Sequence, residues 1–465
     1  MKLAPRDAAW VYLEQENTPL LSIAMYVFDT STDPRGSMTP GEVRAFVAER
    51  VTTVDVFTRR LQRVPLDLDH PSWVADHDFD IDNHLEVTDA RGGGWGELRR
   101  IASEFVGRGL DLQRPPWEMQ VVTGLTDIDG VADASAVLLK FHHSVGDGTA
   151  TLEMTRRLFA AQVDREQVTG PQTPVGPKSV RQAIPTISRQ LRAFVRGIRH
   201  VSAAGKEVKA AVDSGDVRMP PRTRPATRFN GSVGPERTFD AASFLLDDVR
   251  AIRAAGDATV NDVALTVVSG ALRDYLREVG EETEESLAAN VPMSLRSLGH
   301  LESANQITVL QVDLHTDIDD PLERLRAIHT STAAERDRKQ RAEVLRSESL
   351  VDVTPGFVVR AINWIASRLP SSTSSVPYFN VVTTNVARGG VDLWLRDAQA
   401  VSTYGAAALT DRQGLTHAIH SLGDTLTISV LTTPNMMDDP ERYVALIHAQ
   451  FDSLAAAVGA STSTI

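Results

Sequence analysis

The segment from His142 to Gly148 carries the residue types of a general acid–base site. It contains two adjacent histidines, His142 and His143, and an aspartate, Asp147, between Gly146 and Gly148. A histidine with its ordinary pKa near 6.5 can accept a proton from a substrate hydroxyl at neutral pH. The two glycines permit a tight turn in which Asp147 could orient a ring or lock the loop through an arginine. The segment predicts a general base, and a satisfied histidine pair at the end of a strand is the alternative.

An apolar run at residues 136–141 precedes the histidines and predicts a strand that ends at them. Successive side chains of a strand alternate between its two faces. Residues 137, 139 and 141 would therefore share a face with His143, and His142 would point to the other face. We expect only one of the two histidines, His143, to reach a substrate.

Other site chemistries are excluded or disfavoured by the residue types present. The 465 residues contain no cysteine, which excludes disulfides, thiolate zinc sites, iron–sulfur clusters and a cysteine nucleophile. The chain has no Gly-x-Ser-x-Gly motif, and its glycine-rich residues 92–96 lack the spacing of a phosphate or dinucleotide loop. No histidine pair has metalloprotease spacing, so we expect no metal. The net charge of −13 disfavours binding to nucleic acid.

Helical and strand periodicities alternate along the chain and predict a mixed α/β protein. Helices are expected at 41–51, 95–106, 151–162, 245–255, 260–279, 321–341 and 440–458, and strands at 22–28, 136–141, 305–314, 376–383 and 425–432. Proline and glycine are dense at residues 170–177 and 220–225, which bracket a linker. We therefore expect an N-terminal domain at 1–165, a linker at 166–236 and a C-terminal domain at 237–465.

The linker itself predicts an amphipathic helix with a basic face. Seven apolar residues recur at spacings of three and four, namely Ile184, Ile187, Leu191, Phe194, Val195, Ile198 and Val201. The other faces carry basic residues, among them Arg189, Arg192, Arg196 and Arg199. Such a helix could lie on an anionic lipid surface, or it could pack across the two domains with a solvated arginine face. A second apolar segment, residues 357–369, is a weaker candidate for such a lipid-surface helix, and we expect it to belong to the core instead.

No part of the sequence predicts membrane insertion. The N-terminal residues lack the apolar core of a secretory signal, and no run of about 18 apolar residues occurs. We expect a cytoplasmic protein whose contact with membranes, if any, is peripheral.

The sequence resembles the bacterial wax ester synthase/diacylglycerol acyltransferase family over nearly its whole length. The family belongs to the CoA-dependent acyltransferases that share a His-His-x-x-x-Asp-Gly motif, which is also found in nonribosomal peptide condensation domains. Further similar segments are residues 3–10, residues 73–84, Arg114-Pro115-Pro116-Trp117-Glu118, Asn261-Asp262-Val263 and Val291–Arg296. Pro115 and Trp117 match the family's Pro-Leu-Trp element, with Pro116 in place of leucine and Arg114 directly before it.

One segment departs from the family pattern. The family usually has Ser-Asn-Val-Pro-Gly-Pro where this chain has Thr384-Asn385-Val386-Ala387-Arg388-Gly389, without either proline. We expect a less rigid turn there, which bears on substrate preference more than on activity.

The resemblance implies the fold class and the reaction. It implies two chloramphenicol-acetyltransferase-like α/β domains, with mixed sheets flanked by helices, around a central substrate channel. A long-chain acyl group would pass from acyl-CoA, a co-substrate, to diacylglycerol or a fatty alcohol, with no bound cofactor and no acyl-enzyme. His143 would be the general base, with His142, Asp147 and Gly148 completing the motif.

The resemblance also implies roles in the second half of the chain. Asn261, beside Asp262 at the start of a helix, is the candidate oxyanion donor, and a helix cap is its alternative role. Asp147 would orient the loop rather than react. Both substrates are lipids, so peripheral binding to a membrane or lipid droplet is expected, and a homodimer is left open. The rival interpretations are an acyltransferase for another hydroxyl acceptor and a catalytically silent lipid-droplet binding protein.

Overall fold

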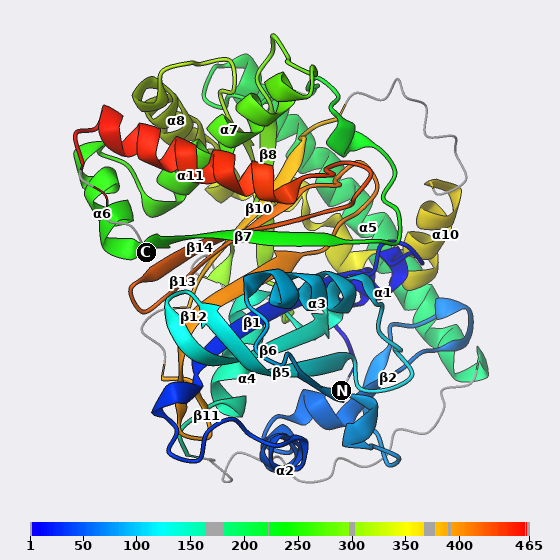
Figure 1. Ribbon diagram of the computed structural model, residues 1–465. Coiled ribbons are helices and arrows are strands. Elements are labelled where there is room, and N and C mark those ends of the chain that lie inside the picture. Colours follow the sequence, from blue (N-terminus) through cyan, green and yellow to red (C-terminus); the bar gives the residue numbers. More distant parts are fainter. Residues whose placement is uncertain are drawn as a thin grey trace.

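The predicted α/β class is confirmed. The computed structural model describes residues 2–162, 180–221, 223–296, 303–366, 377–388, 392–460 and 462, with the side chains of 180–185 and 366 excepted. Within these residues two six-stranded sheets, flanked by helices, and a two-stranded ribbon make up the strand content (Figure 1).

The first sheet has the strand order β11-β12-β1-β6-β5-β4. Its strands are β1 (Leu21–Asp29), β4 (Leu85–Asp89), β5 (Trp117–Ile128), β6 (Val131–His142), β11 (Trp394–Leu395) and β12 (Ala398–Ala407). The second sheet has the order β7-β14-β13-β10-β8-β9. Its strands are β7 (Thr238–Leu245), β8 (Ala288–Ser294), β9 (Ile307–Asp313), β10 (Val381–Ala387), β13 (Thr416–Leu422) and β14 (Thr425–Thr432). The ribbon consists of β2 (Arg59–Gln62) and β3 (Ser72–Ala75).

Helices cover these sheets. They are α1 (Pro5–Leu13), α2 (Pro40–Val51), α3 (Trp95–Gly107), α4 (Gly148–Leu158), α5 (Val180–Asp213), α6 (Leu246–Ala255), α7 (Val260–Glu278), α8 (Pro321–Gln340), α9 (Ala342–Ser347), α10 (Gly356–Ala366) and α11 (Pro440–Ala457). Figure 1 shows α7, α8 and α11 together on the outer side of the second sheet and α3 between the two sheets.

Two expected boundaries are wrong in detail. The strand predicted at 376–383 is β10, Val381–Ala387, and the helix predicted at 151–162 is α4, which begins earlier at Gly148 and ends at Leu158. Asp147 explains the early start, because its side chain caps the helix one residue before Gly148. The proline-rich stretch 170–177 lies outside the described residues.

The first sheet is completed by a segment from far along the chain. β12 pairs antiparallel with β1, with Ser22 opposite Ala407 and Val27 opposite Ser402. β11 and β12 fall inside the predicted C-terminal domain, residues 237–465, yet they belong to the sheet of the N-terminal half. The predicted division of the chain is therefore not a division of the two sheets.

The two faces of β6 enter different cores, as the strand period requires. Ala136 and Leu138 belong to a core that α3 and both sheets share. Val137, Leu139 and Phe141 belong to a second core under α1 and α2. The first core joins the halves of the molecule, and the second fixes the strand that ends at the histidines.

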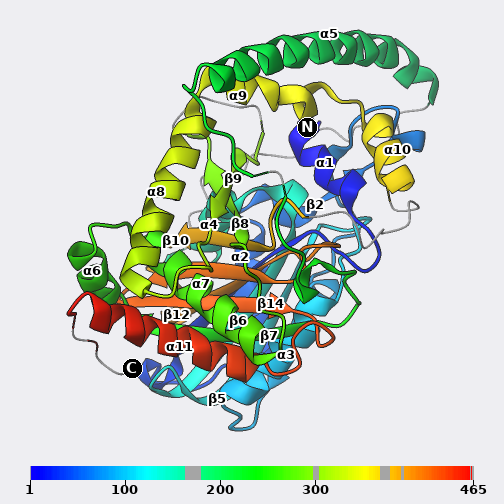
Figure 2. The same cartoon turned by 90° about the horizontal axis from the view of Figure 1, so that it is seen from above.

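Helix α5 lies along one edge of the molecule, against α9 and the short helix η8 (Ser349–Val353) (Figure 2). Gly197 allows this approach, since a Cβ there would lie 2.4 Å from Val353 Cγ2. The predicted apolar stripe is only partly covered, because Leu191, Val195 and Ile198 keep 40%, 49% and 43% of their surface exposed. The predicted basic residues Arg189, Arg192, Arg196 and Arg199 are all exposed, and the side chain of Ile184 lies outside the described residues.

The core prediction for residues 357–369 is wrong for Ile362, Trp364 and Ile365. In α10, which packs on α1, Ile362, Trp364 and Ile365 keep 60%, 57% and 52% of their surface exposed. Residues 367–369 lie outside the described part of the chain. None of the described helices combines the length and the apolar character needed to cross a membrane.

Candidate active site

The two histidines follow β6 into the short helix η5 (His143–Val145) and play different parts. His142 is fully buried, its Nδ1 accepts a hydrogen bond from the Ser144 backbone amide (3.1 Å), and its Nε2 lies 3.2 Å from the Glu14 carboxylate. Glu14 also accepts the backbone N–H of Leu20. His142 therefore fastens the end of β6 to the segment that follows α1, and it does not line the cavity described below.

His143 lines a cavity between the two sheets. Trp10 of α1 stacks on its ring, with 4.4 Å between centroids and an interplanar angle of 18°. The backbone N–H of His143 donates to the Leu20 carbonyl (2.9 Å), and its own carbonyl accepts a hydrogen bond from Asn305 Nδ2 (2.8 Å). The ring is thus held by stacking, while its Nδ1 is buried with no hydrogen-bond partner among the described residues.

Burial sets the protonation state of His143. Its pKa is lowered to about 4, mainly by desolvation and secondly by the neighbouring His142, while Asp147 acts in the opposite direction. The imidazole is therefore neutral at neutral pH, which is the state that can accept a proton.

Asp147 locks the turn instead of orienting the histidine ring. Its carboxylate accepts the backbone N–H groups of Thr149 and Ala150, both at 3.1 Å, and so caps α4. It also accepts two contacts from Arg296 Nη2, at 2.8 and 3.0 Å, and the backbone N–H of Gln306 at 3.1 Å. The sequence predicted that Asp147 either orients a histidine ring or locks the loop through an arginine. In the structure that arginine is Arg296, the last residue of the segment Val291–Arg296 that resembles the family.

Both glycines of the turn stand where a side chain would collide. A Cβ on Gly148 would lie 2.8 Å from Val386 Cγ2, and a Cβ on Gly146 would lie 2.5 Å from Ala150 Cβ. The first contact places the turn directly against β10 of the second sheet. Gly148 is therefore required for the sheets to approach each other at the site.

A second buried carboxylate, Asp7 of α1, joins the N-terminal helix to the same site. It accepts the Ser303 hydroxyl (2.8 Å) and the backbone N–H groups of Ala304 (3.1 Å) and Asn305 (3.0 Å). It also accepts Asn305 Nδ2 at 2.8 Å, the amide that donates to the His143 carbonyl. The segment of residues 3–10 resembles the family in sequence, but the sequence predicts no role for Asp7 or Trp10.

Asn261 and Asp262 lie in the first turn of α7 and do not line the cavity themselves. The N-cap of α7 is Thr259, whose backbone N–H and hydroxyl both donate to Asp262, so Asn261 is not the cap. The Asp262 carboxylate also lies 2.8 Å from His329 Nδ1. Asn261 Oδ1 accepts Asn385 Nδ2 at 3.2 Å, and Asn385 lines the cavity. Asn261 thus contacts the cavity wall through Asn385.

The segment Arg114–Glu118 supports β6 from the side. Trp117 is buried, donates from its indole to the Phe57 carbonyl (3.0 Å) and stacks on His84 at 4.8 Å. The carbonyl of Pro116 accepts the backbone N–H of His142 at 3.0 Å. Pro115 is buried, whereas Arg114 is exposed and does not line the cavity.

The cavity itself has a volume of about 150 Å³ and is mainly apolar. Strands of both sheets line it, with Ile23 and Ala24 of β1 and Val386 of β10 among its walls. Two polar groups that the sequence did not predict also line it, His420 of β13 and Arg388 beyond β10. Neither is near the motif in sequence. Arg388 lies in the segment that departs from the family pattern, whereas no local pattern distinguishes His420.

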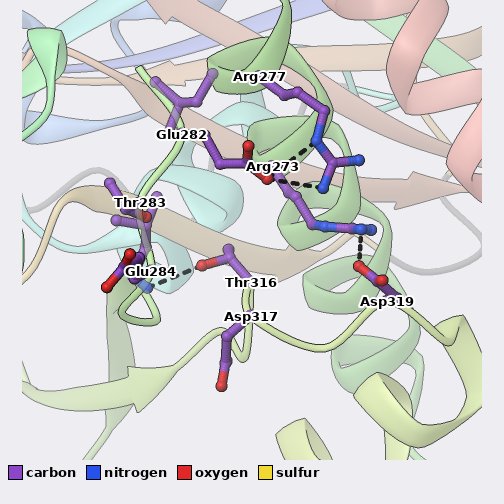
Figure 3. A pocket seen from close by; sticks show the side chains of 10 residues that line it. Arg273, Arg277, Glu282, Thr283, Glu284, Thr316, Asp317 and Asp319 are labelled. Carbon is purple, nitrogen blue, oxygen red and sulfur yellow. Dashed lines mark hydrogen bonds and ion pairs between the residues drawn. The ribbon is translucent and has the colours of Figure 1, made fainter. Parts of the chain in front are cut away.

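A second hollow lies at the other end of α7 and has a different character (Figure 3). Its arginines already have carboxylate partners, since Arg273 pairs with Asp319 and Arg277 with Glu282. Among the described residues no group of three or more potential metal ligands occurs in this hollow or elsewhere.

Sequence comparison with known proteins covers nearly the whole chain. Residues 3–264 match the wax ester synthase/diacylglycerol acyltransferase catalytic domain, and residues 303–455 match the C-terminal domain of the same family. A protein of Mycobacterium tuberculosis (strain CDC 1551 / Oshkosh) with the provisional name diacylglycerol O-acyltransferase is 30% identical over 412 residues, 84% of this chain and 86% of that protein. Another, from strain H37Rv with the same provisional name, is 28% identical over 446 residues, 94% of this chain and 87% of that protein.

Solved structures share the fold. The wax ester synthase/diacylglycerol acyltransferase from Marinobacter aquaeolei VT8 superposes with a TM-score of 0.68 at 22% identity, covering 99% of this chain and all of that one (100%). The starter condensation domain of rhizomide synthetase, in complex with C8-CoA, gives a TM-score of 0.55 at 12% identity, covering 99% of this chain and 95% of that one. The expected two-part acyltransferase architecture is therefore confirmed.

We predict that Arg296→Met destabilises the site. Asp147 is 5% exposed at its side chain and would lose its cationic partner, while Arg296 is 37% exposed, which moderates the effect. The expected loss of unfolding free energy is about 1–3 kcal/mol, with loss of any activity that depends on the turn. Chemical denaturation measures it, with Arg250→Met on the surface of α6 as the matched control. Equal stability of both variants would contradict the role of the ion pair.

Proposed function

The chain belongs to the wax ester synthase/diacylglycerol acyltransferase family and is an acyl-CoA-dependent O-acyltransferase, and we propose that its acceptors are diacylglycerol and long-chain alcohols. The observation that carries the proposal is the neutral His143 in an apolar cavity between two sheets. Long aliphatic substrates suit such a cavity, because apolar walls recognise them without polar partners.

In the proposed reaction His143 accepts the proton of the acceptor hydroxyl as its oxygen attacks the thioester carbonyl of acyl-CoA. The tetrahedral intermediate then collapses, the carbon–sulfur bond breaks, and the imidazolium returns the proton to the CoA thiolate. The ester forms in one displacement, so no acyl-enzyme is required. Trp10 limits the rotation of the imidazole ring because it stacks on one face.

The oxyanion of the intermediate requires a hydrogen-bond donor. We propose the pair Asn261–Asn385 for this role. Asn261 holds one amide hydrogen of Asn385, which leaves the second for a ligand in the cavity. Asn261 would then be a positioning residue, and Asn385 the group that touches the reacting atoms.

The test of the function is product formation from radiolabelled palmitoyl-CoA with diolein and hexadecanol as parallel acceptors. Loss of a general base costs roughly 10²–10⁴ in rate, so His143→Ala should lower kcat by that factor while the fold is retained. His77→Ala, an exposed histidine, is the matched control and should keep full activity. Activity retained in His143→Ala but lost in His142→Ala would overturn the assignment of the base.

The rival interpretations give different results in the same assay. An acyltransferase for another hydroxyl consumes palmitoyl-CoA only when a different acceptor is supplied. A silent lipid-binding protein transfers nothing to any acceptor. The intact His143, Asp147 and Gly148 favour an active enzyme over the silent protein.

The pH dependence of catalysis follows from the buried base. Because burial lowers the pKa of His143 to about 4, the base is unprotonated throughout the neutral range and is lost only as the pH falls toward about 4. We expect kcat/KM to stay level from about pH 6 to about pH 8 and to fall below about pH 5. Initial rates at each pH, with circular dichroism to monitor folding, measure the profile. A limb near pH 6.5 would contradict a desolvated base.

We also propose peripheral binding to an anionic lipid surface through α5 and α10. The exposed arginines of α5 and the exposed Ile362, Trp364 and Ile365 of α10 supply charge and apolar contact. Both helices reach the same loop, since Gln190 donates to Asp69 and Arg360 to Asp67. Acceptor and product are lipids, so a docked enzyme would meet them at the surface.

Vesicle flotation tests this surface. Vesicles with anionic lipid should carry the protein, less so in high salt, because exposed charges are screened. Neutralising Arg189, Arg192, Arg196 and Arg199 should lower the bound fraction. Neutralising four exposed arginines elsewhere, Arg44, Arg100, Arg250 and Arg442, is the matched control. Equal flotation of the two quadruple variants would remove α5 from the proposal.

A further inference from the structure

Arg388 is a buried cation in the wall of the cavity. It follows β10, is 5% exposed and lines the same cavity as His143. Its Nη1 donates to the Tyr26 hydroxyl, and its guanidinium carbon lies 4.7 Å from the centre of the Tyr26 ring. Its Nε is buried without a hydrogen-bond partner. The guanidinium is held in place, but its hydrogen-bonding capacity is not used up.

Within the part of the chain that the structure describes, no carboxylate forms an ion pair with Arg388. The carboxylate among the lining residues, Asp147, is already engaged by Arg296 and by backbone N–H groups. The hollow at the end of α7 behaves differently, since its arginines pair with Asp319 and Glu282 (Figure 3). A buried charge without a counter-ion is costly, so a site that keeps one is suited to an anionic ligand.

Strand β1 carries the anchor points of both groups. The carbonyl of Leu20, just before β1, accepts the backbone N–H of His143, and the hydroxyl of Tyr26, six residues later, accepts Arg388. Between these two positions in the sequence, Ile23 and Ala24 contribute apolar wall to the cavity that His143 and Arg388 both line. A ligand that contacts both groups therefore lies against an apolar wall between its two polar groups.

We propose that Arg388 makes this cavity a site for long-chain hydroxy acids, with the hydroxyl at His143 and the carboxylate at Arg388. The inference rests on the proposed function and narrows its acceptor. The hydroxyl oxygen forms the new carbon–oxygen bond with the acyl carbonyl, the carbon–sulfur bond of acyl-CoA breaks, and the hydroxyl proton passes through His143 to the CoA thiolate. The carboxylate is unchanged, and the product is an ester that keeps a free acid.

The departure from the family pattern falls on this residue. Arg388 occupies the position of the glycine in Ser-Asn-Val-Pro-Gly-Pro. A glycine there would leave no cation in the cavity, so the substitution changes the charge that an acceptor meets. Arg388→Gly consequently removes the cation and with it the proposed recognition.

The experiment compares 12-hydroxyoctadecanoate with its methyl ester as acceptors, with palmitoyl-CoA as donor. The two acceptors share the hydroxyl and the chain and differ in the charge. The wild type should prefer the acid, and Arg388→Gly should reduce the ratio of kcat/KM values, acid over ester, roughly 10- to 100-fold. Arg388→Lys keeps the charge and should retain much of the preference. Arg277→Met, an arginine of the hollow in Figure 3, should leave the ratio unchanged.

The outcomes separate this inference from the proposed function. An unchanged ratio in Arg388→Gly overturns the inference, even if diolein and hexadecanol are good acceptors. A preference only for 1-oleoylglycerol 3-phosphate, whose hydroxyl and phosphate are close together, overturns the long-chain hydroxy acid as the class of acceptor. If the wild type transfers no acyl group at all, calorimetric binding of the acid and the ester to wild type and Arg388→Gly decides the inference independently. Tighter binding of the acid that depends on Arg388 supports it, and equal binding overturns it.

Discussion

The site depends on one buried carboxylate that draws its donors from both halves of the molecule. Asp147 accepts two N–H groups at the start of α4, while Arg296 and the N–H of Gln306 come from the second sheet and the segment that follows it. An uncompensated carboxylate at 5% exposure would be strongly destabilising, so the turn after His143 is stable only when the two sheets are together. Closure of the sheets and formation of this turn are therefore energetically coupled.

The position of the N-terminal helix α1 also depends on a buried carboxylate whose donors come from the second half of the chain. A nine-residue helix has little stability in isolation, and α1 is fixed by the donors that converge on Asp7. Those donors lie at residues 303–305, close to the segment that serves Asp147. Asn305 links the two systems, because its amide contacts both Asp7 and the His143 carbonyl. The stacking of Trp10 on His143 is thus set from the second half of the chain.

The difference between local and long-range contacts explains which features the sequence could predict. Local geometry determines three of the predicted features: the strand of residues 136–141, the turn with Gly146 and Gly148, and the choice of His143 over His142. Local sequence patterns can therefore predict them. The partner of Asp147 lies 149 residues away, and β12 pairs with a strand at the other end of the chain. Contacts between residues so far apart leave no periodic pattern in the sequence. The exposed face of α10 was missed for a related reason, since an apolar pattern does not say whether another element covers it.

Burial has two opposite effects on the chemistry of the cavity. It lowers the pKa of His143 to about 4 and also lowers the pKa of His420, which keeps both rings neutral but would make His143 a weak base in the proposed reaction. The same low-dielectric surroundings strengthen every interaction with a charge that is present. In the proposed reaction, an imidazolium that forms beside the developing oxyanion would be stabilised by that proximity, so the weak base would be compensated in the transition state and not in the resting enzyme. Arg388 lines the same cavity, and its positive charge contributes to the lowered pKa of His420. The desolvation that lowers the pKa of His143 is therefore also the condition under which the proposed recognition by Arg388 would distinguish acceptors by charge.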